Sequence, residues 1–375
     1  MTKKKRAIVS VTNDLYTDNR VNKICLFLVE EGYDVMLIGR LRKNSLPLAE
    51  RIYKTKRMKL FFEKGPLFYA SYNLRLFFYL LFQKTDVIVA NDLDTLLANY
   101  MVKKFKSSTK LVYDSHEYFT EVPELVQRPK IQRFWLRIEE AIFPKLNTIY
   151  TVNESIANLY EEKYKKEVQV VRNISPSWNP TNFLSKSELG IPENKFVLIL
   201  QGAGINVDRG AEEAVEAMRY LNDTVLLIVG DGDIVIDLKK YVKEYDLLEK
   251  VFFFGKRPYN EMMQFTHNAD LGLTLDKATN LNYKFSLPNK VFDYIHAGTP
   301  ILSTKLIEIE RVVVRNKVGI LIEELTVRNL VEAIESLRAN KNLLVELKEN
   351  CQKAALVENW DHEKKVLKEI YTNLG

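Results

Sequence analysis

Residues 195–221 read KFVLILQGAGINVDRGAEEAVEAMRYL, and this stretch decides the fold class. An apolar run at 196–200 has the length of a buried strand, a glycine-rich loop follows at 201–210, and a helical pattern begins at residue 211. A strand that is apolar at consecutive positions is buried on both faces, which is typical of a parallel sheet covered by helices. The stretch therefore predicts one strand–loop–helix unit of an α/β domain.

The same alternation of strand and helix continues on both sides of this stretch, and the proline-rich residues 175–195 interrupt it once. We therefore predict two Rossmann-like, doubly wound domains facing a cleft, over residues 1–178 and 179–356. A final helix in 357–375 stays with the second domain or crosses back to the first. The predicted strands are 6–11, 34–39, 86–91, 110–115, 147–152 and 168–173 in the first domain, and 195–200, 224–230, 250–255, 270–275 and 300–303 in the second.

The composition is that of a globular protein with an uneven charge. Of the 375 residues, 46% are hydrophobic and 28% are charged, which is enough for two cores. Cys25 and Cys351 are the only cysteines, which favours a reducing, cytoplasmic compartment. The basic start MTKKKRAIVSVTND predicts a first strand rather than a signal peptide. Residues 1–180 carry a net +10 and residues 181–375 a net −4, so we expect the first half to meet an anionic partner.

The stretch LFYASYNLRLFFYLLF at 67–82 allows two interpretations. It follows the basic run RIYKTKRMK at 51–59, and Arg75 lies in its middle, so it is too short and too charged to span a bilayer. One interpretation is a buried helix of the first domain. The other is a membrane-surface patch through 51–82, with aromatic side chains in the interface and basic residues on anionic headgroups.

A ligand-binding loop is predicted at QGAGINVDRG, residues 201–210. Gly202 and Gly204 allow the backbone to approach a ligand closely, the following helix start offers free N–H groups, and Arg209 adds a full positive charge. The pattern matches neither GxGxxG nor a P-loop, so a tight strand–helix turn without a ligand is the alternative.

A second candidate segment is FSLPNKVFDYIHAGTP, residues 285–300. Ser286 is predicted as the N-cap of a helix, Pro288 as part of its first turn and Gly298 as its end. Lys290 and Asp293 then share one face of the helix, where they either form a surface ion pair or bind phosphate and a vicinal diol, respectively.

The first domain offers a histidine at the end of a strand. His116 and Glu117 follow the predicted strand 110–115. The Asp-x-Asp triplets at 92–94 and 231–233 resemble metal–diphosphate ligands, but Asp in this place between strand and helix is more often a helix cap. No Cys/His/Asp spacing matches a zinc site, and no nucleic-acid-binding module is recognisable.

Taken together, these motifs resemble glycosyltransferase family 4, which comprises retaining sugar-nucleotide transferases of the GT-B fold. The resemblance covers essentially the whole chain, and the ordered set of motifs carries it rather than any single one. The matching segments are 13–39, VIVANDLDTL at 87–96 and YDSHE at 113–117 in the first domain, and 201–218, LLIVGDGD at 226–233, VFFFGKRPYNEM at 251–262, LPNKVFDYIHAGTP at 287–300 and ENWDHEKKVLKEIY at 358–371 in the second.

The resemblance implies a role for each residue that matches a family motif. Asp293 matches the second acid of the E-x7-E motif, which binds the donor ribose, Arg209 matches the residue that meets the diphosphate, and His116 matches the histidine that touches the transferred sugar. With Lys290 as an added cation, Arg209 and His116 are the catalytic candidates. The donor-binding candidates are Gly202, Gly204, Arg209, Lys256, Arg257, Pro258, Ser286, Leu287, Pro288, Asn289, Lys290 and Asp293, and the acceptor or diphosphate loop comprises Asn13, Asp14, Arg20 and Glu117.

The chain departs from the family pattern at three places. In the first loop, Thr12, Asn13 and Asp14 stand where paired glycines are common. Phe285 stands where the first acid of E-x7-E is found, so backbone groups of Ser286–Asn289 are expected to replace its contacts. Ala203 stands where a second basic residue is usual, and Lys290 or Lys256 is expected to supply that charge.

The expected function is therefore retaining transfer of a hexose or N-acetylhexosamine from a UDP- or GDP-sugar to a glycan or lipid-linked acceptor in cell-surface polysaccharide synthesis. We expect a cytoplasmic enzyme that needs no metal or other cofactor and binds no nucleic acid. If the segment 51–82 is a surface patch, the enzyme is peripheral at the inner face of the membrane. A sugar-nucleotide 2-epimerase of the same fold and a non-catalytic nucleotide-sugar-binding partner are the alternatives.

Overall fold

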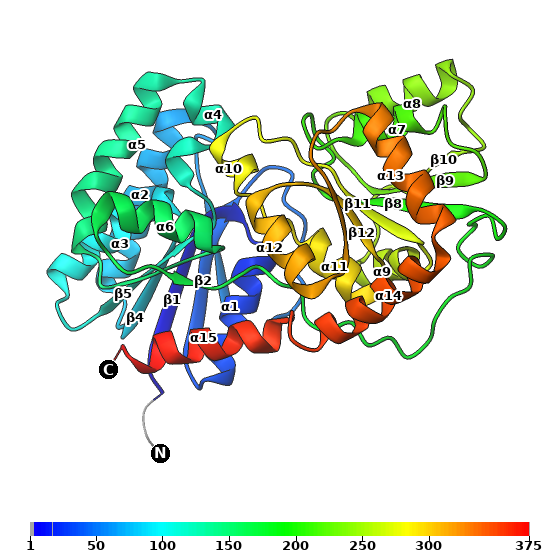
Figure 1. Cartoon of the computed structure of the whole chain (residues 1–375). Helices are drawn as coiled ribbons and strands as arrows, with labels where there is room; N and C mark the ends of the chain where they lie inside the picture. Colours follow the sequence, from blue (N-terminus) through cyan, green and yellow to red (C-terminus); the bar gives the residue numbers. More distant parts are fainter. Residues whose placement is uncertain (1–3, 17, 375) are drawn as a thin grey trace. The chain divides into compact units, whose positions relative to one another are not determined.

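The computed structural model describes residues 4–16 and 18–374. The chain forms two compact units (Figure 1). Unit 1 contains the chain up to Asn173 together with the residues from Lys364 onward, and unit 2 runs from Ile174 to Glu363. The chain thus leaves unit 1 shortly before the predicted boundary and returns to it within its last helix.

Unit 1 is built on a parallel sheet whose strands follow the order β3-β2-β1-β4-β5-β6-β7. The strands are β1 (Arg6–Asp14), β2 (Asp34–Leu41), β3 (Lys54–Lys59), β4 (Val87–Asn91), β5 (Lys110–Ser115), β6 (Thr148–Thr151) and β7 (Gln169–Val170). The helices of this unit are α1 (Asn19–Glu30), α2 (Gly65–Phe82), α3 (Leu93–Phe105), α4 (Pro123–Val126), α5 (Pro129–Ile142) and α6 (Glu154–Tyr164), with short 3-10 turns at Phe119–Glu121 and Phe143–Lys145.

Unit 2 is built on a second parallel sheet with the order β10-β9-β8-β11-β12-β13. The strands are β8 (Phe196–Gly202), β9 (Thr224–Gly230), β10 (Val251–Phe253), β11 (Leu271–Thr274), β12 (Ile301–Thr304) and β13 (Gly319–Ile322). The helices are α7 (Ala211–Ala217), α8 (Val235–Glu244), α9 (Tyr259–His267), α10 (Leu281–Lys284), α11 (Lys290–Ala297), α12 (Ile307–Asn316), α13 (Val327–Ala339), α14 (Lys341–Ala355) and the start of α15 (Trp360–Thr372).

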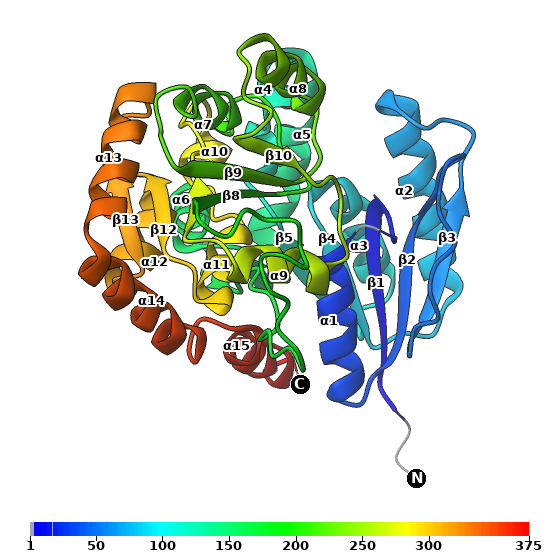
Figure 2. The ribbon, with the colours of Figure 1, turned by 90° about the vertical axis from the view of Figure 1, so that its right-hand side faces the viewer.

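The apolar strand that opened the sequence analysis is buried on both faces, as predicted. Leu198 and Leu200 of β8 pack into one core cluster with Ala214 of α7, whereas Val197 and Ile199 pack into another with residues of α11 and α12. Figure 2 shows α7 on one side of β8 and β9 and α9 and α11 on the other. Because helices cover both faces of this sheet, its strands are apolar at consecutive positions.

The last helix of the chain packs on the first one. From Lys364 onward α15 belongs to unit 1, where the Nζ atoms of Lys364 and Lys368 lie 3.2 Å from carboxylate oxygens of Glu30 and Glu31 at the end of α1. The ring of Tyr371 lies 5.8 Å from that of Phe27, centroid to centroid. Ion pairs at the surface and an aromatic contact beneath them therefore hold α15 against α1.

Each sheet has a point where its strand order reverses. In unit 1 this point lies between β1 and β4, and in unit 2 it lies between β8 and β11. Parallel α/β sheets bind ligands outside the carboxyl ends of the two strands at such a point. The residues that follow these four strands are therefore the first place to look for a functional site.

Candidate active site

The loop after β8 leaves its backbone open on one side. A Cβ atom at Gly202 or Gly204 would meet no atom of its surroundings closer than 3.8 Å, so the space beside both glycines is open. Gly202 has a φ of 143°, a backbone conformation that favours glycine, whereas Gly204 has no such requirement. Gly230 at the end of β9 differs, because a Cβ atom there would lie 1.8 Å from the carbonyl oxygen of Gly202. The ends of β8 and β9 are thus tightly joined, while the loop beyond them remains accessible to a ligand.

A cluster of two cations and one acid lies at the strand-order reversal of unit 2. Asp276 follows β11 and is fully buried, and Arg209 Nη1 donates to its Oδ1 at 2.7 Å. The Arg209 guanidinium also lies over the ring of Tyr283, 4.1 Å from the centroid. Oδ2 of Asp276 is buried without a hydrogen-bond partner in the described residues. Arg209 is therefore held in place from two sides.

Lys290 is the second cation of this cluster. Burial lowers its pKa, the Asp276 carboxylate opposes this shift, and the charge of Arg209 adds to it. Within the described residues Lys290 makes no ion pair or hydrogen bond, so the predicted surface ion pair with Asp293 is wrong. Two cations share one buried carboxylate, which leaves a net positive charge at this point.

Asp293 is buried in the first turn of α11, with only 6% of its surface exposed. Its Oδ1 accepts hydrogen bonds from Ser175 Oγ at 2.9 Å and from Tyr259 Oη at 3.1 Å. Its Oδ2 accepts a longer bond of 3.4 Å from Gln201 Nε2. Burial and the Asp293 carboxylate both raise the pKa of the Tyr259 hydroxyl, which stays protonated as a donor. The carboxylate is thus fixed in one orientation.

The segment before α11 differs from the prediction. The helix begins at Lys290 with Asn289 as its N-cap, so Ser286 is not the cap and Pro288 lies outside the helix. Ser286 N instead donates to Tyr283 O in the turn that follows the short helix α10. Gly298 ends the helix in the left-handed conformation, with φ 73°, as predicted. The chain from 286 to 289 is a partly exposed loop rather than a helical turn.

The remaining predicted donor residues lie after β10. Lys256 is largely exposed and pairs with Asp231 at 3.4 Å. Arg257 Nη1 donates to Glu261 at 3.0 Å, and Pro258 directly precedes α9. No group of His, Cys, Asp and Glu in the described residues has the arrangement of a metal site.

In unit 1 four charged side chains alternate in sign at the strand-order reversal. Arg20 Nη2 donates to Asp114 Oδ1 at 2.7 Å, and both side chains are almost completely buried. His116 Nε2 lies 3.3 Å from Asp114 Oδ2, and His116 Nδ1 lies 3.3 Å from Asp92 Oδ2. The backbone N–H of His116 also donates to Asp92 Oδ1 at 2.8 Å. Asp92 stands at the N-cap position of α3, as predicted, but its carboxylate binds His116 instead of the helix.

This arrangement keeps His116 protonated. Burial by itself lowers the pKa of His116, but the carboxylates of Asp92 and Asp114 raise it to about 9. Burial raises the pKa of Asp114, and the charges of Arg20 and His116 overcome this effect and hold the pKa at about 2. At neutral pH His116 is therefore an imidazolium, which donates hydrogen bonds and carries charge but cannot accept a proton.

The other predicted residues of unit 1 have mainly structural partners. Asn13 Nδ2 donates to Asp18 at 3.2 Å, and Asp14 pairs with Arg57 at 3.5 Å. Glu117 is exposed beside His116. Sequence reasoning missed Asp276, Ser175, Tyr259, Gln201 and Asp114. The only available signal was that Asp276 and Asp114 lie at or just beyond the end of an apolar run.

The comparison with known families supplies the deciding observation. Residues 182–355 match the family model described as glycosyl transferases group 1, and residues 19–174 match the one described as glycosyltransferase family 4. The two matches together span most of the chain. The chain belongs to this glycosyltransferase family. The predicted family and the predicted enzyme class are therefore confirmed.

Several solved structures of low sequence identity share this fold. Sucrose-phosphate synthase from Thermosynechococcus elongatus is 16% identical, with a TM-score of 0.79 over 99% of both chains. WaaG, a glycosyltransferase of lipopolysaccharide biosynthesis, is 16% identical, with a TM-score of 0.74 over 97% of this chain and 99% of its own. Anabaena HepE in complex with UDP is 14% identical, with a TM-score of 0.73 over 98% of this chain and 100% of its own. No curated protein matched the sequence. The predicted GT-B fold is confirmed.

Proposed function

We propose that this glycosyltransferase moves a hexose or N-acetylhexosamine from a UDP- or GDP-sugar to a hydroxyl of a glycan or lipid-linked acceptor, with retention of configuration. The proposed setting is cell-surface polysaccharide synthesis in the cytoplasm, peripheral at the inner face of the membrane. The observation that carries the proposal is the cluster of Arg209 and Lys290 around the single buried carboxylate of Asp276.

The proposed role of this cluster is to hold the diphosphate and to stabilise it as it leaves. Arg209 is fixed by Asp276 and by the Tyr283 ring, and Lys290 makes no direct ion pair or hydrogen bond with the described residues. A preorganised donor at a developing negative charge commonly contributes about 3 kcal/mol to transition-state stabilisation. Two such cations meet the electrostatic need of a diphosphate leaving group, and we therefore propose that no metal cofactor takes part.

The proposed chemical step is compatible with these charges. The bond between the anomeric carbon and the diphosphate oxygen breaks through an oxocarbenium-like state, and the acceptor oxygen bonds to the same face of that carbon. The acceptor proton passes to the departing phosphate oxygen. A protonated His116 fits this scheme, because the acceptor proton passes to the phosphate oxygen and His116 is not needed as a base.

The donor nucleotide is proposed to bind Asp293 through its ribose hydroxyls. A fixed, ionised carboxylate is a suitable acceptor for a vicinal diol. Structures of Anabaena HepE hold UDP or UDP-glucose, which favours a uridine nucleotide as the first donor to test.

The experiment that tests the proposed function is a donor panel. The full chain is incubated with UDP- and GDP-sugars, with and without a lipid-diphosphate glycan, and the release of free nucleotide is followed. We expect acceptor-dependent release and a product with the donor's anomeric configuration by NMR. Tight binding without release would replace the proposal with a non-catalytic binding role. Conversion of the donor into its 2-epimer would replace it with epimerase activity.

A further inference from the structure

Helix α2 is apolar on two sides, and only one of them is buried. Its buried side consists of Phe68, Tyr72, Leu76 and Leu80, which pack into unit 1. A second stripe faces solvent, with the residues Leu67, Leu74, Phe78 and Phe82. The stretch is a helix of the first unit, as one interpretation predicted, but only one of its apolar sides is buried. A helix that is apolar all round normally has a partner on each side.

The solvent-facing stripe continues onto the neighbouring helix. Leu97, Met101 and Phe105 of α3 are exposed at successive intervals of four residues, so they share one face. The Phe77 ring joins the two helices, since it lies 5.3 Å from the Phe78 ring and 5.9 Å from the Phe105 ring. Just before α2, the Phe61 side chain is 91% exposed.

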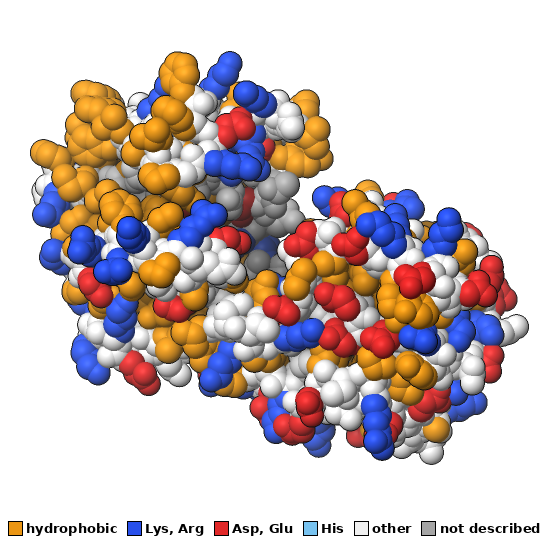
Figure 3. All heavy atoms as spheres, turned by 90° about the horizontal axis from the view of Figure 1, so that it is seen from above, with side chains coloured by type: hydrophobic (Ala, Val, Ile, Leu, Met, Phe, Trp, Pro, Cys, Tyr) orange, Lys and Arg blue, Asp and Glu red, His pale blue; other side chains and the backbone are white. Residues whose placement is uncertain are grey.

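We call this surface the α2–α3 face. It consists of Phe61, Phe62, Leu67, Leu74, Phe78, Phe82, Leu97, Met101 and Phe105. Figure 3 shows hydrophobic side chains gathered on unit 1, at the left of the view, with Lys and Arg side chains among them. A contiguous exposed apolar surface with a polar rim marks a contact site for another molecule or for a membrane.

The charge around the α2–α3 face is almost entirely positive. The segments 51–85 and 95–110, within which the face lies, contain twelve Lys and Arg residues and one acid, Glu63. Lys59, Lys64, Arg75 and Lys104 make no ion pair within the described part of the chain. Lys104 lies instead over the Tyr100 ring at 5.3 Å, with its ammonium group beside the apolar surface.

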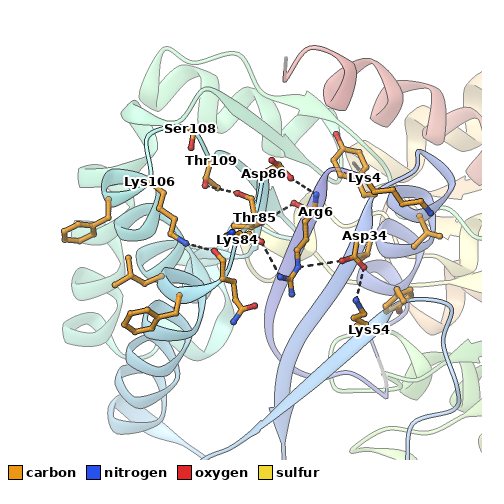
Figure 4. A pocket seen from close by; sticks show the side chains of 18 of the residues that line it. Lys4, Arg6, Asp34, Lys54, Lys84, Thr85, Asp86, Lys106, Ser108 and Thr109 are labelled. Carbon is orange, nitrogen blue, oxygen red and sulfur yellow. Dashed lines mark hydrogen bonds and ion pairs between the residues drawn. The ribbon is translucent and has the colours of Figure 1, made fainter. Parts of the chain in front are cut away.

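A basic hollow adjoins one end of the face. The hollow has a volume of about 1310 Å³, and Phe82 and Phe105 contribute to its wall (Figure 4). Its lining includes six Lys or Arg residues and two acids. Lys84 lies two residues beyond Phe82 at the end of α2, and Lys106 directly follows Phe105 at the end of α3. The Lys106 Nζ donates to the carbonyl oxygens of Leu80 and Gln83, which holds this cation at the end of α2. An anionic surface that received Phe82 and Phe105 would meet these cations next.

We infer that the α2–α3 face of unit 1 docks on the surface of an anionic lipid bilayer. Large aromatic and leucine side chains would enter the acyl boundary, and the surrounding cations would contact the headgroups. No helix in the described residues is long and apolar enough to cross a bilayer, so the face would lie on the membrane without spanning it. A second copy of this chain fits less well, because its own cations would oppose these. The inference deepens the proposed function, because docking would bring the enzyme to a lipid-linked acceptor. Only this link to the acceptor rests on the proposed function.

The test is flotation of the full chain with lipid vesicles at low and high salt. We expect binding to vesicles of phosphatidylcholine mixed with phosphatidylglycerol, weaker binding at high salt, and little binding to phosphatidylcholine alone. The variant Phe78→Ser/Phe82→Ser/Phe105→Ser should bind anionic vesicles about tenfold less. The matched control Ile236→Ser/Leu248→Ser/Leu356→Ser removes equally exposed apolar residues from unit 2 and should bind like the wild type.

Three results would overturn the inference. These are equal vesicle binding by the aromatic variant, equal binding to neutral and anionic vesicles, and a solution dimer that the aromatic variant dissociates. Thermal unfolding and UDP affinity, measured on every variant, separate a folding defect from a lost surface. Vesicle binding does not depend on turnover, so a chain that binds vesicles without releasing nucleotide would contradict the proposed function and leave the docking surface intact.

Discussion

We expect the substitution Asp293→Asn to weaken UDP binding by about 10- to 100-fold. The magnitude follows from the hydrogen bonds of the carboxylate. Ser175 and Tyr259 both donate to Oδ1, whereas Gln201 reaches Oδ2 only at 3.4 Å, so the Oδ2 side is the weaker protein contact and the expected place of the ribose. A hydrogen bond to a charged group contributes about 1.5–3 kcal/mol, and each 1.4 kcal/mol is about tenfold in affinity.

Asparagine is chosen instead of alanine because it preserves the hydrogen bonds that residue 293 makes within the protein. Thr266 Oγ1 donates to Gln201 Oε1 at 2.5 Å, which fixes the Gln201 amide with its NH2 group toward residue 293. An asparagine would place its oxygen toward Gln201 and its NH2 group toward the hydroxyls of Ser175 and Tyr259. Hydroxyl groups accept as well as donate, so the network survives and mainly the charge is lost.

The assay compares two nucleotides by isothermal titration calorimetry. UDP and 2′,3′-dideoxy-UDP are each titrated into the wild type, into Asp293→Asn and into the control Tyr259→Phe, which keeps the charge but removes one partner hydroxyl. We expect the Asn variant to lose affinity for UDP and to bind the dideoxy nucleotide as the wild type does. Loss of the same factor with both nucleotides, or with neither, would refute the ribose assignment.

Three further predictions follow from the charges of the two sites. Lys290→Met should lower kcat by about 100-fold in steady-state kinetics, because it removes one of the two cations proposed to stabilise the leaving diphosphate. The control Lys256→Met, at a largely exposed lysine, should leave kcat within about twofold of the wild type. His116→Gln should destabilise the protein at pH 6 and hardly at pH 10 in thermal unfolding. The folded-state pKa of His116 is raised to about 9, so its stabilising effect is complete below its unfolded value and disappears as the pH rises through 9. Asp114→Asn should lower the free energy of unfolding by about 3–5 kcal/mol in urea, because it leaves Arg20 buried without its partner.

The strands buried on both faces could be predicted from the sequence, whereas two of the edge strands, β3 and β13, could not. β8 and β9 are apolar at consecutive positions because helices cover both of their faces. β3 reads KTKRMK and lies at the edge of its sheet, where five of its six side chains are not buried. Its lysines protect an exposed edge from pairing with another chain, and they also hide the strand from any hydrophobic pattern. β13, the other missed strand, is likewise an edge strand.

The candidate site was predictable where its residues follow a strand directly. Arg209 and His116 come shortly after apolar runs, and the rule for parallel sheets brings such residues to one edge. Asp276 also follows a strand, but its importance comes from pairing with Arg209, which is 67 positions away in the sequence. Ser175 and Asp293 are 118 positions apart. No local spacing encodes such contacts, because they arise only when the strand order of the sheet is fixed.

The charged clusters of the two units differ in net charge and therefore suit different ligand groups. In unit 1 the cations Arg20 and His116 face the acids Asp114 and Asp92 at distances of 3.3 Å or less, so this cluster is nearly neutral. Its members present oriented hydrogen-bond donors without a net charge, which suits hydroxyl groups. In unit 2 Arg209 and Lys290 share one carboxylate, and burial already lowers the pKa of Lys290. Such a site gains most from an anion, because the anion supplies the missing charge. We therefore propose that the diphosphate binds at the unit 2 cluster and that the unit 1 cluster meets hydroxyl groups of the sugar or the acceptor, although both clusters contain two cations.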